Sequence, residues 1–200
     1  MFTGIIEELG TVRSASEGEL TIGCKHVLWG TNLGDSISVN GVDLTAKHFD
    51  EEGFEANVMP ETYRCSNLGD LRPGDKVNLE RSLQLAGRVS GHLVRGVVEA
   101  TGRLRSLTPE AGAIVARFEA PREILRYVAM KGPVAVDGIS LTVMAKDEDS
   151  FSVSLVEYTQ EHTNLHTRNP GDRVNLETDI IARYVEQMLD DRREAGIGRT

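Results

Sequence analysis

Residues 73–80 read Pro-Gly-Asp-Lys-Val-Asn-Leu-Glu, and residues 170–177 read Pro-Gly-Asp-Arg-Val-Asn-Leu-Glu. The second octapeptide follows the first at a spacing of 97 positions (175 − 78), and the same spacing joins identical residues upstream: Gly41 and Gly138, Leu44-Thr45 and Leu141-Thr142, Phe54 and Phe151, Thr62 and Thr159, Asn67-Leu68 and Asn164-Leu165. Near the N-terminus the spacing is 92, from Gly4-Ile5-Ile6-Glu7 to Gly96-Val97-Val98-Glu99, so the second copy carries five additional residues (97 − 92). A shared register of this length predicts a domain duplication, and two copies are too few for a solenoid.

The duplication divides the 200-residue chain into two small domains and a terminal segment. We predict an N-terminal domain over residues 1–90, a C-terminal domain over residues 91–178, and an oligomerisation helix with a tail over residues 179–200. Each domain is long enough to bury a modest core of its own.

Composition narrows the class of partner. The formal charge is −9, from 22 Lys and Arg against 31 Asp and Glu. Because affinity for nucleic acid rests on Lys and Arg neutralising phosphates, this balance disfavours nucleic acid and favours a small-molecule ligand. No apolar run reaches the roughly 18 residues of a membrane span, and the first residues lack the basic start of a signal peptide, so we expect a cytoplasmic protein with no membrane partner. Cys24 and Cys65 lack metal-site or redox spacing, and we expect both to be reduced and buried.

Short β-prone runs separated by turn residues predict an all-β protein. Residues 36–42 alternate polar and apolar side chains into an Asn-Gly turn, and residues 134–139 follow the same course into Asp-Gly, which predicts two hairpins. Further predicted strands are residues 54–59, 77–79, 151–156 and 174–176. This density of strands fits a small barrel or a sandwich, and we favour the barrel. Residues 121–128 begin with proline and place apolar residues three and four apart, which predicts a short helix that closes one barrel end.

Residues 179–191 predict an amphipathic helix that has no counterpart after the first copy. Thr178 is its predicted N-cap, and its apolar stripe comprises Ile181, Tyr184, Val185, Met188 and Leu189. Such a stripe must be buried, against either its own chain or a partner subunit, and the second case makes the protein an oligomer. Residues 194–200 are expected to form a frayed tail.

Six strings, in this order on the duplicated frame, resemble the riboflavin synthase family of the alpha-chain type. They are Met1-Phe2-Thr3-Gly4-Ile5-Ile6-Glu7-Glu8, Asn40-Gly41-x-x-Leu44-Thr45, Met59-Pro60-Glu61-Thr62, Val77-Asn78-Leu79-Glu80-Arg81-Ser82-Leu83, Gly91-His92-Leu93-Val94 and Asp137-Gly138-Ile139-Ser140-Leu141-Thr142-Val143. Any one of them would be a weak signal, whereas the set covers nearly the whole chain and is specific.

The resemblance implies two homologous six-stranded Greek-key barrels of the lumazine-binding type in tandem plus a C-terminal α-helix, assembled as a homotrimer. It also implies the reaction, a dismutation in which one 6,7-dimethyl-8-ribityllumazine gives a four-carbon unit to a second, yielding riboflavin and 5-amino-6-ribitylamino-pyrimidinedione. No metal or redox cofactor is required. The resemblance further allows an association with lumazine synthase.

Carried over by position, the resemblance implies two substrate pockets. The first would be lined by Gly4, Ile5, Ile6, Ser36, Val42, Asp43, Leu44, Thr45, Asn57, Val58, Met59, Pro60, Glu61 and Thr62, the last six as a strand. The second would be lined by Gly96, Val97, Val98, Lys131, Ser140, Leu141, Thr142, Val156, Glu157, Tyr158, Thr159, Gln160 and Glu161. His92 and Asp137 would lie beside them. The hydroxyls among these residues suit a ribityl chain and a pyrimidinedione edge, which need neutral hydrogen-bond partners more than charge.

The chain departs from the family's pattern at three places. Asp43 stands where the family usually has cysteine, Val97 where it usually has a second histidine, and Glu157-Tyr158-Thr159 where it usually has Pro-His-Thr or a relative of it. Catalysis would then rest on Ser36, Asp43, His92 and Asp137 together with substrate positioning, and a buried Asp43 could accept a proton in place of a thiolate.

The same residues also have alternative, purely structural explanations. Thr45 and Thr142 are good strand residues, Asn40 and Asp137 are turn formers, and His92 could be a hydrogen-bonded core histidine. The other histidines, His26, His48, His162 and His166, are predicted to be surface or packing residues, and the repeated octapeptide to be architecture rather than chemistry. At the level of function, a non-catalytic lumazine or flavin carrier is the alternative to the enzyme, and a purely structural double barrel is a third reading.

Overall fold

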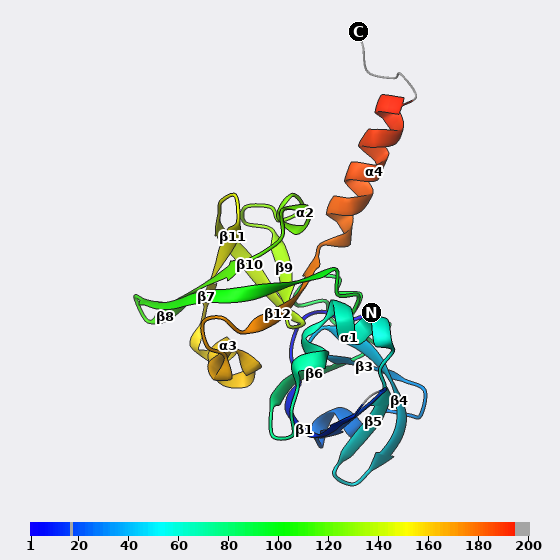
Figure 1. The fold of residues 1–200 in the computed structure, drawn as a ribbon. Coiled ribbons are helices and arrows are strands. Elements are labelled where there is room, and N and C mark those ends of the chain that lie inside the picture. Colours follow the sequence, from blue (N-terminus) through cyan, green and yellow to red (C-terminus); the bar gives the residue numbers. More distant parts are fainter. Residues whose placement is uncertain (17, 195–200) are drawn as a thin grey trace.

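The computed structural model describes residues 1–16 and 18–194, with no side-chain description for residues 191–194. It contains two closed barrels and a C-terminal helix (Figure 1). The first barrel is formed by β1 (Glu8–Ser16), β2 (Glu19–Gly23), β3 (Ser36–Val39), β4 (Val42–Asp50), β5 (Gly53–Asn57) and β6 (Lys76–Arg81). The second is formed by β7 (Ala100–Glu110), β8 (Ala113–Glu119), β9 (Pro133–Val136), β10 (Ile139–Lys146), β11 (Ser150–Leu155) and β12 (Arg173–Thr178).

The two barrels share one topology. The strands follow the order β1-β2-β5-β4-β3-β6 in the first barrel and the equivalent cyclic order β7-β8-β11-β10-β9-β12 in the second, with every pairing antiparallel. This order is a Greek key, and it confirms the predicted fold of two six-stranded barrels in tandem.

Both predicted hairpin turns are present, and the backbone explains their sequences. Asn40 and Gly41 have φ angles of 47° and 79°, and Asp137 and Gly138 have 46° and 78°. Two consecutive positive φ angles define the tight hairpin turn that Asn-Gly and Asp-Gly favour. The turns also touch each other, because a Cβ on Gly41 would lie 2.7 Å from the Gly138 nitrogen. Glycine is therefore required where the two barrels meet.

The five additional residues of the second copy can now be located. The first β-hairpin ends at the pair Ser16↔Glu19, whereas its counterpart continues past Thr108↔Val115 to Pro109↔Ile114 and Glu110↔Ala113. Two further pairs account for four residues and give the β7–β8 hairpin its projecting end (Figure 1). The fifth lies between β8 and β9, where α2 (Arg122–Leu125) replaces η1 (His26–Leu28). The predicted helix is thus shorter than expected, and Pro121 is its N-cap rather than its first residue. Its Ile124 and Leu125 pack into the second core.

The strand predicted over residues 57–62 was wrong. Residues 57–62 do not form a strand, because β5 ends at Asn57 and α1 (Pro60–Cys65) begins three residues later, followed by η2 (Asn67–Asp70). In the second copy, α3 (Glu157–His162) and η3 (Asn164–Thr167) take the same places. Met59 is extended, as a residue before proline prefers, and Pro60 begins the helix because it needs no hydrogen bond to its nitrogen. Helices of this length are too short to show a helical period in the sequence.

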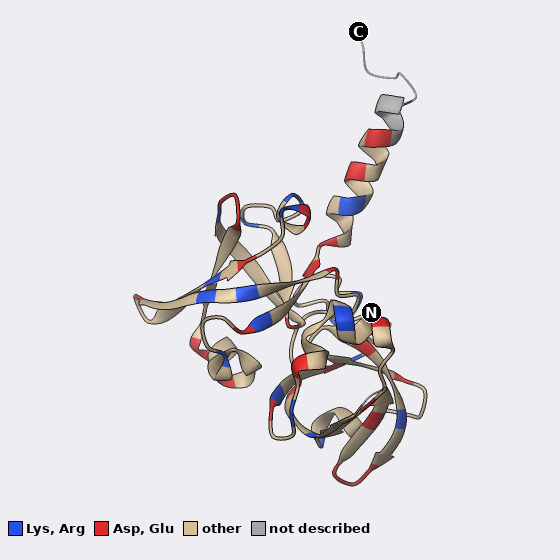
Figure 2. Cartoon of the chain, in the orientation of Figure 1, with Lys and Arg blue, Asp and Glu red and all other residues tan. Residues whose placement is uncertain are grey.

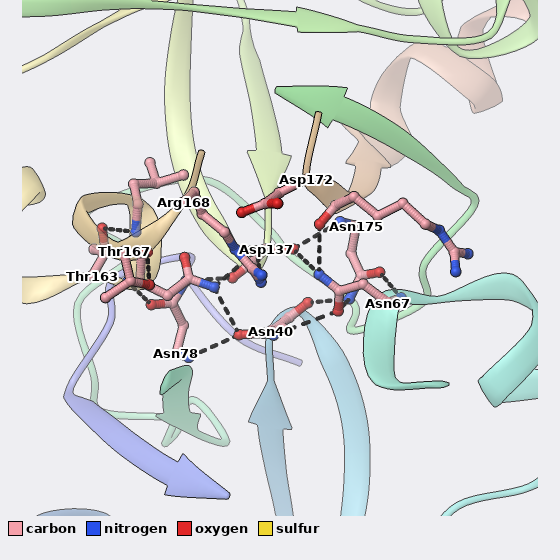
Figure 3. Close-up of polar contacts among 12 residues, drawn as sticks. Asn40, Asn67, Asn78, Asp137, Thr163, Thr167, Arg168, Asp172 and Asn175 are labelled. Carbon is pink, nitrogen blue, oxygen red and sulfur yellow. Dashed lines mark hydrogen bonds and ion pairs between the residues drawn. The ribbon is translucent and has the colours of Figure 1, made fainter. Parts of the chain in front are cut away.

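A buried layer of amides joins the barrels (Figure 3). Across the interface, Asn78 Nδ2 donates to the Asp137 carbonyl (2.9 Å) and to Asn164 Oδ1 (3.0 Å). Asn175 Nδ2 makes the equivalent bonds to the Asn40 carbonyl (2.8 Å) and to Asn67 Oδ1 (2.9 Å). All six residues are at most 2% exposed. We call Asn40, Asn67, Asn78, Asp137, Asn164 and Asn175 the amide layer.

The amide layer is symmetric except at one pair. Asp137 stands where the first copy has Asn40, and Arg168 stands where it has Leu71. The fully buried Asp137 carboxylate accepts from Asn67 Nδ2, Asn164 Nδ2 and the Asn175 nitrogen at 2.7–2.8 Å, and it pairs with Arg168 at 2.8 Å. A buried carboxylate needs such neutralisation, because desolvating an unpaired charge is costly.

The C-terminal helix, α4 (Ile180–Glu194), begins one residue later than predicted. Its first turn is capped by Asp179, whose carboxylate accepts from the Ile181 nitrogen at 3.0 Å, while the predicted cap Thr178 donates to Glu99 instead. Ion pairs of Arg183 with Glu99 and of Glu186 with Arg126 hold its base to the second barrel.

The remainder of α4 extends away from both barrels (Figure 1). Along it, charged residues are interspersed with uncharged ones (Figure 2). The predicted apolar stripe, Ile181, Tyr184, Val185, Met188 and Leu189, is 49–66% exposed, so its own chain does not cover it. The tail expected at residues 194–200 falls, from residue 195 on, outside the described residues. No helix in the described part of the chain is long and apolar enough to cross a membrane.

We predict that Arg168→Leu lowers the free energy of unfolding by about 3 kcal/mol, since it leaves the buried Asp137 carboxylate without its cation. The double variant Asp137→Asn/Arg168→Leu repeats the first copy's own combination of Asn40 and Leu71, and it should recover most of that loss. Urea unfolding of both variants measures the effect. Equal losses in the single and double variants would show that the carboxylate does not depend on Arg168.

Candidate active site

Two short segments cross from one barrel to the other, and they build the candidate site. Residues 1–6, the N-terminal arm, lie against the second barrel: the Gly4 carbonyl accepts from the Ser140 nitrogen at 2.8 Å, and Ile6 packs on the second core. Residues 92–98, the linker arm, lie against the first barrel: the Gly96 carbonyl accepts from the Asp43 nitrogen at 2.9 Å, and Val98 packs on the first core. The arms pair with each other through Phe2 and Val94.

The crossing corrects the predicted grouping of the pockets. Gly4, Ile5 and Ile6 were assigned to the first pocket and Gly96, Val97 and Val98 to the second. The structure places the first set beside Ser140 on the second barrel and the second set beside Asp43 on the first. Sequence could not show this exchange, since each arm is covalently next to the barrel that it leaves.

The approach of the arms depends on glycine. Gly4 and Gly96 have φ angles of 76° and 82°, which L side chains rarely adopt. A Cβ on Gly4 would lie 2.7 Å from the Ser140 nitrogen, and one on Gly96 would lie 3.0 Å from the Asp43 nitrogen. At Gly4 and Gly96 the arms therefore meet the opposite barrel through their backbone.

The first face, as we call it, combines β4, the start of α1 and the linker arm. Thr45 is exposed on β4, and the pair Ala46↔Ala56 sets it opposite Asn57 at the end of β5. Val97 and Met59 are 52% and 67% exposed. Val42, Leu44 and Val58 are buried in the barrel core, so they support this face from below. Glu61 is bound by Arg64 and the Cys65 thiol on α1.

The second face combines β10, the start of α3 and the N-terminal arm. Thr142 is exposed on β10, Ile5 is 44% exposed on the arm and Val156 is 58% exposed before α3. Tyr158 stacks on His162 with ring centroids 4.0 Å apart, a pair that the first copy lacks, having Glu61 and Cys65 there. The backbone nitrogen of Lys131 donates to the Val143 carbonyl. Thr159, Gln160 and Glu161 follow on α3, and Leu141 points into the core.

One of the four predicted catalytic residues, His92, meets the predicted binding residue Ser140 on the second face. His92 Nδ1 lies 2.7 Å from Ser140 Oγ, and no described atom bonds to its buried Nε2. Burial lowers the pKa of His92, and the charge of Asp179 opposes this shift. A neutral imidazole bonded to a hydroxyl can accept or return a proton.

The remaining predicted catalytic residues lie apart. Asp43 is half-buried under Gly96 at the first face. Ser36, on the first barrel, lines a cavity of about 510 Å³ with Thr3, Ile5 and Glu80, so Ile5 borders both this cavity and the second face. Asp137 is held within the amide layer, and the structure brings it to neither face.

The structure agrees with the predictions for Cys24 and for four histidines, but not with the prediction for Cys65. Cys24 is buried, and burial raises the pKa of its thiol to about 12. Cys65, predicted to be buried, is instead exposed on α1, because it belongs to a helix that the sequence did not reveal. His26, His48, His162 and His166 are exposed, as predicted.

Comparison with known proteins matches this architecture. The lumazine binding domain family model matches residues 3–82 and 95–179. Riboflavin synthase from Mycobacterium tuberculosis (strain ATCC 25618 / H37Rv) is 47% identical over 197 residues, covering 94% of this chain and 98% of that protein. The chain belongs to the riboflavin synthase family.

The family's fold also occurs in LumP. Its crystal structures with riboflavin and with 6,7-dimethyl-8-(1'-D-ribityl) lumazine superpose with TM-scores of 0.83 and 0.81, at 20% identity, covering 89% of this chain and 99% of that one. Within the residues described here, no group of three or more His, Cys, Asp or Glu side chains could hold a metal ion.

Sequence reasoning missed the two glutamates that hold the arms. Glu80 and Glu177 end the repeated octapeptide, which was predicted to be architecture only, yet both bond to arm residues (2.7–3.0 Å) at the two faces. The available signal was a glutamate at the same position of both copies, directly after the leucine of each predicted strand.

We predict that His92 titrates below the usual histidine pKa of about 6.5, because burial disfavours its charged form. Since the folded-state pKa is the lower one, His92 contributes stability above about pH 6.5 that is lost as the pH falls through the folded-state value. NMR titration of the imidazole signals measures this, and His92→Gln identifies the signal by its loss. A His92 pKa at or above about 6.5 would contradict the prediction.

Proposed function

We propose that this protein is an enzyme of riboflavin biosynthesis, which converts two molecules of 6,7-dimethyl-8-ribityllumazine into riboflavin and 5-amino-6-ribitylamino-pyrimidinedione by transfer of a four-carbon unit. The observation that carries the proposal is the presence of two equivalent faces, each made of one barrel and the other copy's arm. A reaction between two identical molecules needs two similar binding sites, and the duplication supplies them. Family membership supports the same reaction.

The proposed chemistry depends mainly on positioning. Holding two reactants in an attack geometry can contribute roughly 7–11 kcal/mol at best. The two products contain all the atoms of the two substrates, so the dismutation needs no external oxidant or reductant. Exposed Thr45 and Thr142 offer neutral hydrogen-bond groups to the ligands.

Proton transfer is assigned to groups on the two faces. One proton must leave the 7-methyl group of one lumazine, and a nucleophile must add at C7 of the other. We assign these steps to Asp43 on the first face and to the His92–Ser140 pair on the second. Asp137 then acts through the amide layer by fixing the hairpin that carries Ser140. Ser36, in its neighbouring cavity, is the remaining candidate group.

We propose that the active assembly is a homotrimer in which α4 buries its stripe against partner copies. An exposed apolar stripe of five residues on a projecting helix supports this, because such faces mark protein contacts. In this assembly the first face of one copy would meet the second face of a neighbour. We further propose that the enzyme works in the cytoplasm, which fits its two unpaired cysteines. Association with lumazine synthase stays a prediction.

The decisive experiment incubates purified protein with 6,7-dimethyl-8-ribityllumazine alone. We expect riboflavin absorbance to appear over many turnovers, more than one ligand bound per chain, and a particle of three chains by light scattering. Tight binding of one ligand per chain without product would instead identify a carrier, the alternative function.

Asp43→Asn should reduce turnover roughly 10²-fold while leaving lumazine affinity within about twofold, because a general base contributes to the transition state rather than to ground-state binding. Steady-state rates and fluorescence titration separate the two effects. Glu51→Gln, an exposed change in the same barrel, is the matched control. Full turnover in the Asp43 variant would remove this residue from the mechanism.

A further inference from the structure

Two buried glutamates accept hydrogen bonds from the arms, mostly from backbone nitrogens. Glu80 on β6 accepts from the Thr3 nitrogen and hydroxyl (2.7 Å each) and from the Gly4 nitrogen (2.9 Å). Glu177 on β12 accepts from three consecutive nitrogens, those of Arg95 (2.7 Å), Gly96 (3.0 Å) and Val97 (3.0 Å). The two residues are 4% and 3% exposed.

Such an arrangement is too costly to arise from packing alone. Placing a carboxylate in a buried site is unfavourable unless its oxygens receive several hydrogen bonds. Burial raises the pKa of both groups, and the arm donors oppose that shift. A strand residue of a barrel does not need a charged side chain for the barrel to form. We therefore explain the two buried carboxylates by the hydrogen bonds that they accept from the arms.

Each glutamate acts on the face of the opposite barrel. Glu177 belongs to the second barrel, and the three nitrogens that it binds flank the Gly96 carbonyl, which lies on Asp43 of the first face. Glu80 belongs to the first barrel, and it binds the nitrogen of Gly4, whose carbonyl lies on Ser140 of the second face.

We propose that Glu177 is the positioning residue of the first face and Glu80 that of the second, so that each barrel sets the geometry of the other barrel's ligand site. The proposal deepens the proposed function and rests on it for the identity of the ligand. We assign neither glutamate a contact with the ligand, because the oxygens of both accept hydrogen bonds from the arms. The two sites are then reciprocal, because a change of the glutamate in one barrel alters ligand binding at the other barrel.

The two arms are not held equally. Arg95 also reaches Glu177 at 3.4 Å and Glu99 at 2.7 Å, and Glu99 binds Arg183 at the base of α4. Within the described part of the chain, Glu80 accepts from neutral donors, which are the Thr3 hydroxyl and the nitrogens of Thr3 and Gly4. The linker arm is thereby tied to the proposed assembly helix, whereas the N-terminal arm is held by neutral donors.

The test compares Glu177→Gln with Glu80→Gln in the full-length protein. Glutamine keeps the size of the side chain but directs an N–H at backbone donors. Amide hydrogen exchange reports on the arms: we expect Glu177→Gln to accelerate exchange about tenfold at residues 95–97 and less than twofold at residues 3–4, and Glu80→Gln to do the reverse, as the loss of a charge-assisted bond implies.

Ligand binding is then read separately at each face. Riboflavin is titrated while exchange is followed at residues 57–62 for the first face and 156–161 for the second. Glu177→Gln should raise the riboflavin concentration for half-protection about tenfold at residues 57–62 only, and Glu80→Gln at residues 156–161 only. Glu110→Gln, at the exposed end of the β7–β8 hairpin, is the matched control and should change neither.

The outcomes distinguish the two proposals. Equal effects of either variant on both faces, or lowered stability with unchanged half-protection, would overturn the positioning role. If riboflavin and 6,7-dimethyl-8-ribityllumazine protect neither face of the unaltered protein, the proposed function fails, while exchange at the arms still tests what the glutamates hold. Should a glutamine variant not fold, Glu177→Asp and Glu80→Asp keep the charge one methylene further away, and the same reciprocal pattern is expected at smaller amplitude.

Discussion

The amide layer between the barrels is the constraint on which the remaining structure depends. An asparagine side chain buried in one barrel alone would have to leave its donors and acceptors without partners, which costs more than an ordinary hydrogen bond returns. Asn78 and Asn175 find their partners on the other barrel, so the layer is satisfied only in one relative orientation. Two domains with separate apolar cores are thus fixed to each other by polar groups (Figure 3).

That orientation allows the arms to cross. With the Gly41 and Gly138 turns in contact, the hairpins that carry Asp43 and Ser140 lie side by side, each within reach of the opposite arm. Glycine lets the arm backbone approach, and a buried glutamate holds it there. The side chains then differ between the faces, because Ser140 stands where the first copy has Asp43 (43 + 97 = 140), and the His92 imidazole bonds to Ser140.

The duplication gives two domains of the same fold, and the two faces differ in a few side chains. In the proposed reaction, a donor and an acceptor are the same molecule in different roles, so the sites must bind alike and react differently. The proposed binding elements are the repeated ones, such as Thr45 and Thr142. The reactive ones, and the Asp137–Arg168 pair that fixes the Ser140 hairpin, occur in one copy only.

Much of this could be predicted from the sequence, and the failures have physical reasons. The repeat predicted two domains, and the Asn-Gly and Asp-Gly turns were correct because positive φ angles are a local demand that only a few residues meet. The α1 and α3 helices were missed because six residues cannot display a helical period. From the sequence, Asp137 was predicted to be a turn former with a catalytic role. Its burial could not be predicted, because the groups that bind its carboxylate, such as Arg168 and Asn175, come from distant parts of the chain.

By itself, the sequence determined the two barrels, their common register and the amphipathic terminal helix. Local propensity, alternation and repetition are enough for these, because each acts over a few neighbouring residues. Only the tertiary structure decided which residues share a face. Gly4 meets Ser140 and Gly96 meets Asp43 across the interface, and contacts between segments so far apart in the chain are set by the docking of the barrels, which no local pattern encodes.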